Sequence, residues 1–107
     1  MSALESCIAQ YLNYLSIERQ ASKHTISNYT RDLQAWQDYC QSHNLSEPNA
    51  VLFTHVQQFM AQEHRRGLAA KSVQRRLSAV RSLFTYLTRQ GITKDNPSKG
   101  LRPPKAP

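Results

Sequence analysis

The stretch KSVQRRLSAVRSLFTYLTRQG, residues 71–91, decides the fold. Its apolar residues recur at alternating steps of four and three. At about 100° per residue, this spacing places them in one stripe along a helix. The stripe consists of Val73, Leu77, Val80, Phe84 and Leu87. We therefore predict a helix with one buried face, closed by Gly91 in the left-handed conformation that ends many helices.

Three further segments repeat this spacing and carry helix-start signals. Ser2 with Glu5 can form a capping box, Ser22 is a suitable N-cap, and Thr54 with Gln57 can cap a third helix that ends before Gly67. We expect helices at about 2–19, 22–41, 54–66 and 70–90.

The connecting segments contain helix breakers. The run HNLSEPNAVL, around Pro48, interrupts the periodicity, and GITKDNPSKGLRPPKAP combines four prolines with glycine. No strand pattern occurs. The sequence therefore predicts an all-α fold, in which residues 1–92 form a compact four-helix bundle of two helical hairpins and residues 93–107 form a basic, extended linker.

Positive charge is concentrated in the second half of the chain. The net charge is +7, yet residues 1–53 hold three basic and five acidic side chains, whereas residues 54–107 hold eleven basic and two acidic ones. This asymmetry favours a polyanionic partner, with nucleic acid ahead of an acidic protein or membrane. A membrane span is not predicted, since no apolar run approaches about 20 residues, and a signal peptide is not predicted, since the N-terminus lacks the pattern of a charged and then an apolar stretch. We expect a cytoplasmic protein.

The cysteines and histidines do not suggest a metal site, a cofactor or a disulfide framework. Cys7 and Cys40 match no zinc-ligand spacing, and Cys40 extends the apolar stripe of its helix. We interpret both thiols as small buried hydrophobic groups.

Helical geometry places cations and hydroxyls opposite the apolar stripes. In residues 71–91, Lys71, Arg75 and Ser78 project outward, while Arg76 and Arg81 flank the core. This segment contains no acidic residue, so we expect unpaired cations. Replacing Arg75 or Arg76 by alanine should then weaken binding of a polyanion with little change in melting temperature.

The segment 22–41 shows a similar polar face near its start. His24, Ser27 and Arg31 point outward there, where free backbone N–H groups also favour phosphate. Arginine and lysine neutralise phosphates, while hydroxyl groups donate to phosphate oxygens and arginine can read base edges. The combination is typical of a surface that binds double-stranded DNA.

Three runs carry a family resemblance: YLNYLSIERQASKHTISNYTRDLQAW, RRGLAAKSVQRRLSAVRSLFTYL and DNPSKGLRPPKAP. Together they resemble the N-terminal core-binding, SAM-like domain of tyrosine recombinases of the phage-integrase family, and within it the Xer branch. The resemblance implies a domain that forms half of a clamp on a recombination half-site. It also implies a tetramer of recombinase protomers, including an XerD-like partner, and a catalytic domain that lies C-terminal to this chain. No catalytic residue is assigned here.

The resemblance also implies which residues contact DNA. The implied contacts are Lys23, His24, Thr25 and Ser27 in the second predicted helix, and Lys71, Ser72, Arg75, Arg76 and Arg81 in the fourth. One departure is Ala69, because relatives commonly have serine before the fourth helix, and the hydroxyl cap is lost.

Two questions stay open at this point. A helical protein-interaction module with a basic docking face is an alternative function, and a salt titration with duplex DNA and an acidic protein would distinguish the two. A chromosomal recombinase that resolves chromosome dimers and a mobile-element integrase would share the same domain.

Overall fold

The computed structural model describes residues 2–103. It contains the helices α1 (Ala3–Ile17), α2 (Lys23–Ser42), α3 (Phe53–Arg65) and α4 (Ala70–Arg89), with a short 3-10 helix η1 (Pro48–Ala50) before α3. No strand occurs within this range. The predicted all-α class and four helices are confirmed, with bounds that differ by at most two residues.

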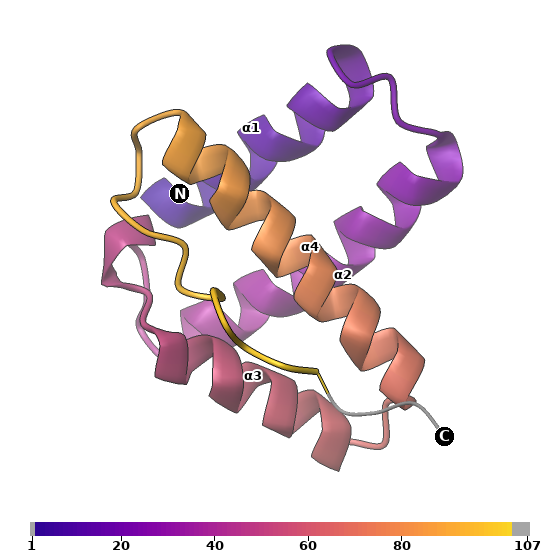
Figure 1. Cartoon of the computed structure of the whole chain (residues 1–107), viewed down its shortest axis with the longest axis vertical. Helices are drawn as coiled ribbons and strands as arrows, with labels where there is room; N and C mark the ends of the chain where they lie inside the picture. The colour runs from indigo at the N-terminus through magenta and orange to yellow at the C-terminus, as the bar shows by residue number, and fades with distance from the viewer. Residues whose placement is uncertain (1, 104–107) are drawn as a thin grey trace.

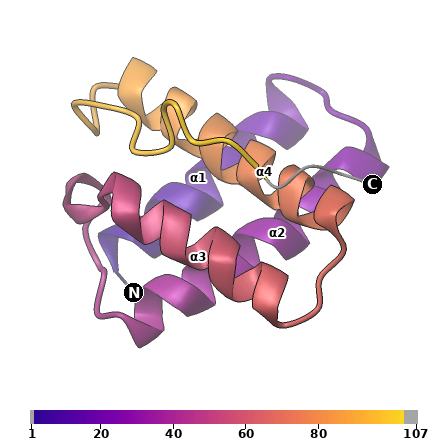
Figure 2. The same ribbon diagram turned by 60° about the horizontal axis from the view of Figure 1, so that its bottom comes forward.

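The helices pair as two antiparallel hairpins, α1 with α2 and α3 with α4 (Figures 1 and 2). Helix α4 crosses α2 near the middle of the molecule (Figure 1). Helix α3 packs against α4 and lies at the lower edge of Figure 1. Both figures place the starts of α2 and α4 on the same side of the fold, at the right. Two helix N-termini therefore face one side of the domain.

The core lies between the two hairpins. All five residues of the predicted α4 stripe are at most 1% exposed. Trp36 of α2 lies at its centre and meets Phe59 and Phe84 edge to face, with ring centroids 5.2 and 6.3 Å apart. Cys7 and Cys40 are buried as predicted, and burial raises the pKa of Cys40 to about 12.

The helix starts agree with the sequence in α1 and α2 and differ in α3. The hydroxyls of Ser2 and Ser22 each accept a backbone N–H bond at 3.1 Å, as predicted. The predicted Thr54 cap is wrong, because α3 already begins at Phe53 and Leu52 is its N-cap. His55 Nδ1 accepts the Leu52 N–H at 2.9 Å, the bond that Glu or Gln makes in a capping box, whereas Leu52 supplies no side-chain cap.

The segment after α4 packs on the helices rather than extending away from them. It has no helix or strand over residues 93–103, yet it runs back along α4 (Figures 1 and 2). Leu101 is only 8% exposed and belongs to the core, and the Asn96 amide donates to the Arg81 carbonyl at 3.2 Å. The expectation of an extended linker from residue 93 is therefore corrected. Residues 104–107 of that predicted linker lie outside the described residues.

Candidate nucleic-acid interface

Polar and cationic side chains are exposed along the N-terminal halves of α2 and α4. Most residues predicted to contact DNA on these two helices are exposed, and Ser72 is half-buried. Free backbone N–H groups of the first turn add partial positive charge at each helix start. The exposed residues are Lys23, His24, Thr25, Ser27 and Arg31 on α2, and Lys71 and Ser78 on α4.

Arg75 is held by a carboxylate from another helix. Its Nε donates to Asp32 Oδ2 at 2.9 Å, and its Nη2 donates to Asp32 Oδ1 at 3.1 Å. Asp32 is fully buried, whereas the Arg75 side chain keeps 35% of its surface exposed. The hydrogen bond to Asp32 raises the pKa of Arg75, so the guanidinium stays charged. The prediction of unpaired cations on α4 is therefore wrong at this position.

Arg76 is an interior ion-pair residue. Its Nε lies 3.2 Å from Asp32 Oδ1, and its Nη1 lies 3.0 Å from Glu63 Oε1 of α3. Only 14% of its side chain is exposed. Arg76 thus joins α2, α3 and α4, and the expectation that its removal would leave the melting temperature unchanged conflicts with this geometry.

Arg81 is turned toward the C-terminal segment. Its Nη2 donates to the Leu101 carbonyl at 2.6 Å, and the residue is half-buried. Like Arg76, it is not a free cation. Its side chain fixes the returning segment on α4.

The sequence analysis missed Asp32 and Glu63, although both carry a recognisable signal. Asp32 follows Tyr29 by three positions and precedes Trp36 by four, and Glu63 follows Phe59 by four. Both acids therefore lie on the apolar faces of their helices, where a carboxylate requires a partner. An acidic residue in a buried stripe is a sign of an interhelical ion pair.

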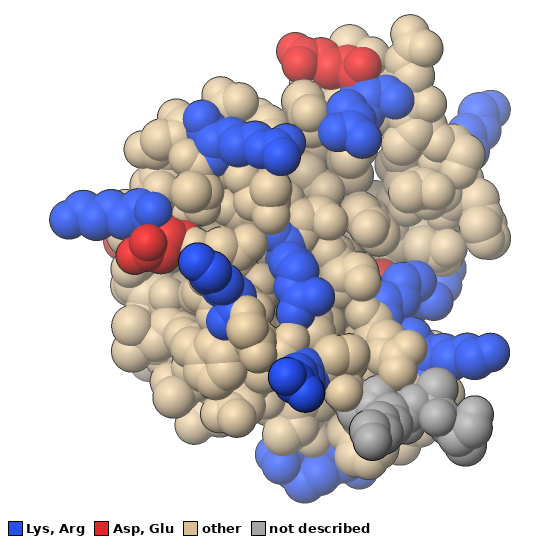
Figure 3. Space-filling model, in the orientation of Figure 1, with Lys and Arg blue, Asp and Glu red and all other residues tan. Residues whose placement is uncertain are grey.

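Lysine and arginine predominate on the face that contains α4 and the C-terminal segment (Figure 3). Acidic groups appear there mainly at the margins. Of the lysines and arginines discussed above, Lys23, Arg31, Lys71 and Arg81 take part in no ion pair within residues 2–103, and the first three of them are exposed. The exposed positive charge is thus left to attract an anionic partner.

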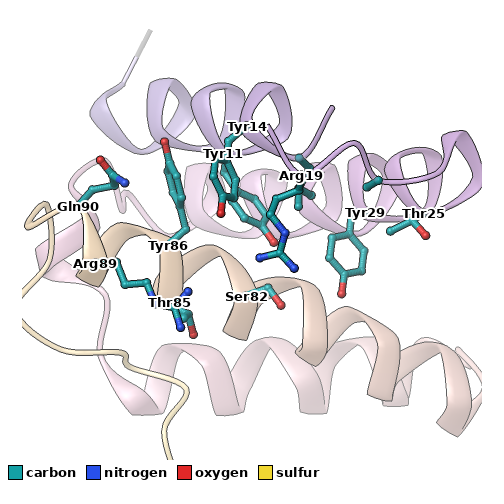
Figure 4. Close-up of a pocket in the computed structure, with 12 residues that line it drawn as sticks. Tyr11, Tyr14, Arg19, Thr25, Tyr29, Ser82, Thr85, Tyr86, Arg89 and Gln90 are labelled. Atoms are coloured by element: carbon teal, nitrogen blue, oxygen red, sulfur yellow. The ribbon is translucent and has the colours of Figure 1, made fainter. Parts of the chain in front are cut away.

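A tyrosine-lined cavity of about 410 Å³ lies between α1, the start of α2 and the C-terminal half of α4 (Figure 4). The Tyr14 and Tyr86 rings pack at 4.7 Å between centroids, and Tyr11 lies 5.4 Å from Tyr86. Tyr86 is therefore half-buried against α1. Burial raises the pKa of Tyr11 to about 12. Arg19 and Arg89 flank these rings and extend the positive surface.

Residues 8–91 match the family model described as "Phage integrase, N-terminal SAM-like domain". The chain belongs to this family. Over 95% of its own length, this SAM-like domain is 40% identical to the tyrosine recombinase XerC of Pseudomonas syringae pv. tomato. It is 43% identical to XerC of Xanthomonas axonopodis pv. citri over 95% of its length, and 41% identical to XerC of Escherichia coli O9:H4 over its whole length.

The SAM-like domain spans about a third of these relatives, since the matches cover 34%, 37% and 36% of their lengths. It corresponds to the N-terminal domain, and the catalytic region of the relatives lies elsewhere. Its fold is similar to the crystal structure of the N-terminal domain of a phage integrase/site-specific recombinase from Haloarcula marismortui. That match has a TM-score of 0.81 and 15% identity over 97% of each chain. Within the described part of the chain, no helix has the length and apolarity needed to cross a membrane.

Proposed function

We propose that this SAM-like domain binds double-stranded DNA and forms half of the clamp with which a XerC-like tyrosine recombinase holds a recombination half-site. The observation that carries the proposal is the shared orientation of the starts of α2 and α4, which expose cations and hydroxyls on one side. Family membership supports the same function, because the relatives are recombinases by name.

The exposed residues have distinct roles in this proposal. Lys23, Arg31 and Lys71 neutralise phosphates, and Ser27 and Ser78 donate hydrogen bonds to phosphate oxygens. Arg75 contributes through the part of its guanidinium that Asp32 leaves exposed. Arg76 and Arg81 act indirectly, because their internal bonds hold the helices and the C-terminal segment in place.

In the whole recombinase, this domain acts together with a catalytic region and with other protomers. We propose assembly on DNA as a tetramer that includes an XerD-like partner, in the cytoplasm. The role closest to the XerC relatives is resolution of chromosome dimers, and the same interface would serve a mobile-element integrase.

A salt titration tests DNA binding against docking on an acidic protein. Fluorescence anisotropy with a labelled duplex should show log K falling by roughly 0.9 per log unit of salt for each phosphate neutralised. A size-matched acidic protein should bind more weakly at every salt concentration. Equal or tighter binding of the acidic protein would favour the protein-interaction module instead.

A further inference from the structure

We propose that Asp32 is a positioning residue that aims Arg75 at the phosphate backbone of DNA. This inference rests on the proposed DNA-binding function and assigns a role to a buried acid that would not itself touch DNA. Asp32 is fully buried, yet both of its carboxylate oxygens accept bonds from Arg75, which is partly exposed.

The pair leaves Arg75 able to bind a second anion. A guanidinium has five N–H donors, and the bonds to Asp32 from Nε and Nη2 use two of them. The remaining donors lie on Nη1 and on the other edge of Nη2. With 35% of the side chain exposed, they are available to a phosphate oxygen at the surface.

The position of Arg75 places these donors among the other proposed contacts. Lys71 and Ser78 lie one helical turn before and after Arg75 on α4, and Arg31 precedes Asp32 on α2. Arg75 thus joins α4 to α2 through Asp32, one residue or one helical turn away from these exposed positions.

Fixing the guanidinium before binding reduces the entropy lost on contact. A free arginine side chain must give up rotamer freedom to hold a phosphate, and a bidentate bond to a buried acid removes that freedom in the unbound domain. Asp32 itself would repel phosphate weakly, because its charge is compensated inside the domain: Arg75 and Arg76 balance Asp32 and Glu63, and this network of four residues carries no net charge.

For the substitution Asp32→Asn, a change of charge alone and a loss of positioning predict opposite changes in DNA affinity. Asp32→Asn raises the net charge of the domain by one, so a purely Coulombic effect would tighten DNA binding. Loss of positioning would weaken it, by about three- to tenfold. The slope of log K against log salt should also become shallower by up to about 0.9, since one phosphate contact is lost.

Glu63→Gln is the matched control. It adds the same charge to the same network, but Glu63 contacts Arg76 and not Arg75. We expect DNA affinity equal to or above that of the unsubstituted domain. Circular dichroism melts identify a temperature at which all variants are folded, and anisotropy is measured there. Arg75→Lys, which keeps the charge and loses the bidentate bond, should also weaken binding, and it tests the inference should Asp32→Asn not fold.

Binding by Asp32→Asn or Arg75→Lys that is as tight as in the unsubstituted domain would overturn the inference. An equal loss of DNA affinity in Glu63→Gln would overturn the inference too, because the loss would then follow from weakening the ion-pair network and not from releasing Arg75. The proposed function has its own readout in the same assay, Lys71→Ala. Weaker binding by that variant supports DNA binding even where the result for Asp32 is negative.

Discussion

Arg81 of α4 donates a hydrogen bond from Nη2 to the backbone carbonyl of Leu101 at 2.6 Å. The bond joins the middle of the last helix to a residue 20 positions further along the chain. Because the Leu101 side chain is also part of the core, polar and apolar contacts together hold the C-terminal segment on the domain. The folded unit therefore extends beyond α4.

Leu101→Ala should lower the free energy of unfolding by about 2 kcal/mol, at the lower end of the values for buried leucine, because Leu101 lies in a segment without helix or strand that can partly close over the cavity. Urea denaturation followed by circular dichroism measures the change. Arg102→Ala is the control, since its side chain is exposed and its loss should change stability very little. Equal stability of both variants would show that the segment contributes nothing to the fold.

Arg76→Ala should destabilise the domain by about 3 kcal/mol or more, because it leaves Glu63 buried without its closest partner and weakens the pairing of Asp32. The control is Arg66→Ala, which removes a largely exposed arginine 3.8 Å from the same glutamate. That variant should lose at most about 0.5 kcal/mol. Similar melting temperatures for the two variants would contradict an interior role for Arg76.

Ala69→Ser should stabilise α4. The backbone of Ala69 already has the extended conformation of an N-cap residue, and no side chain caps the helix. A serine hydroxyl could accept a first-turn N–H, as Ser22 does in α2, which is worth about 1 kcal/mol. Thermal unfolding should show a higher melting temperature, and Ser22→Ala should lower it by a similar amount. A lower melting temperature for Ala69→Ser would indicate that the start of α4 cannot accommodate the hydroxyl.

Alkaline pH should destabilise the domain through Cys40. Its pKa is raised from 9.0 to about 12 by burial, so the folded state keeps a proton that the unfolded chain releases. The stabilising effect is present below pH 9 and is lost as the pH rises toward 12. The free energy of unfolding measured in urea should be lower at pH 10.5 than at pH 8, and Cys40 should contribute on the order of 1–2 kcal/mol to this difference. Cys40→Ala should reduce the difference, and an unchanged difference would assign it to other groups such as Tyr11.

The fold could be predicted from local patterns because helix faces and helix ends are local properties. The α4 stripe, the Ser2 and Ser22 caps, and the ends at Gly67 and Gly91 all depend on residues within a turn or two. The start of α3 could not be predicted in this way, since the N-cap residue Leu52 has no capping side chain and His55 makes the capping-box bond usually made by Glu or Gln.

The candidate site could be predicted only in part, because ion pairs between helices are not visible in one segment. The absence of acids in residues 71–91 indicated free cations, yet Asp32 lies 43 positions before Arg75 and meets it only where α2 and α4 cross. The exposed residues at the starts of α2 and α4 could be predicted from the periodicity of each helix, as Lys23 and Lys71 illustrate. Arg76 and Arg81 show that a cation beside a core stripe is available for internal bonds.

Binding of a labelled duplex to Lys23→Ala and Lys71→Ala, across a range of salt concentrations, tests the central claim most directly. Each variant should stay folded, bind more weakly and reduce the slope of log K against log salt by about 0.9. Lys94→Ala is the control, because Lys94 is exposed but belongs to neither helix start. Unchanged affinity and slope in both variants, or an equal loss in Lys94→Ala, would contradict a DNA interface at the starts of α2 and α4.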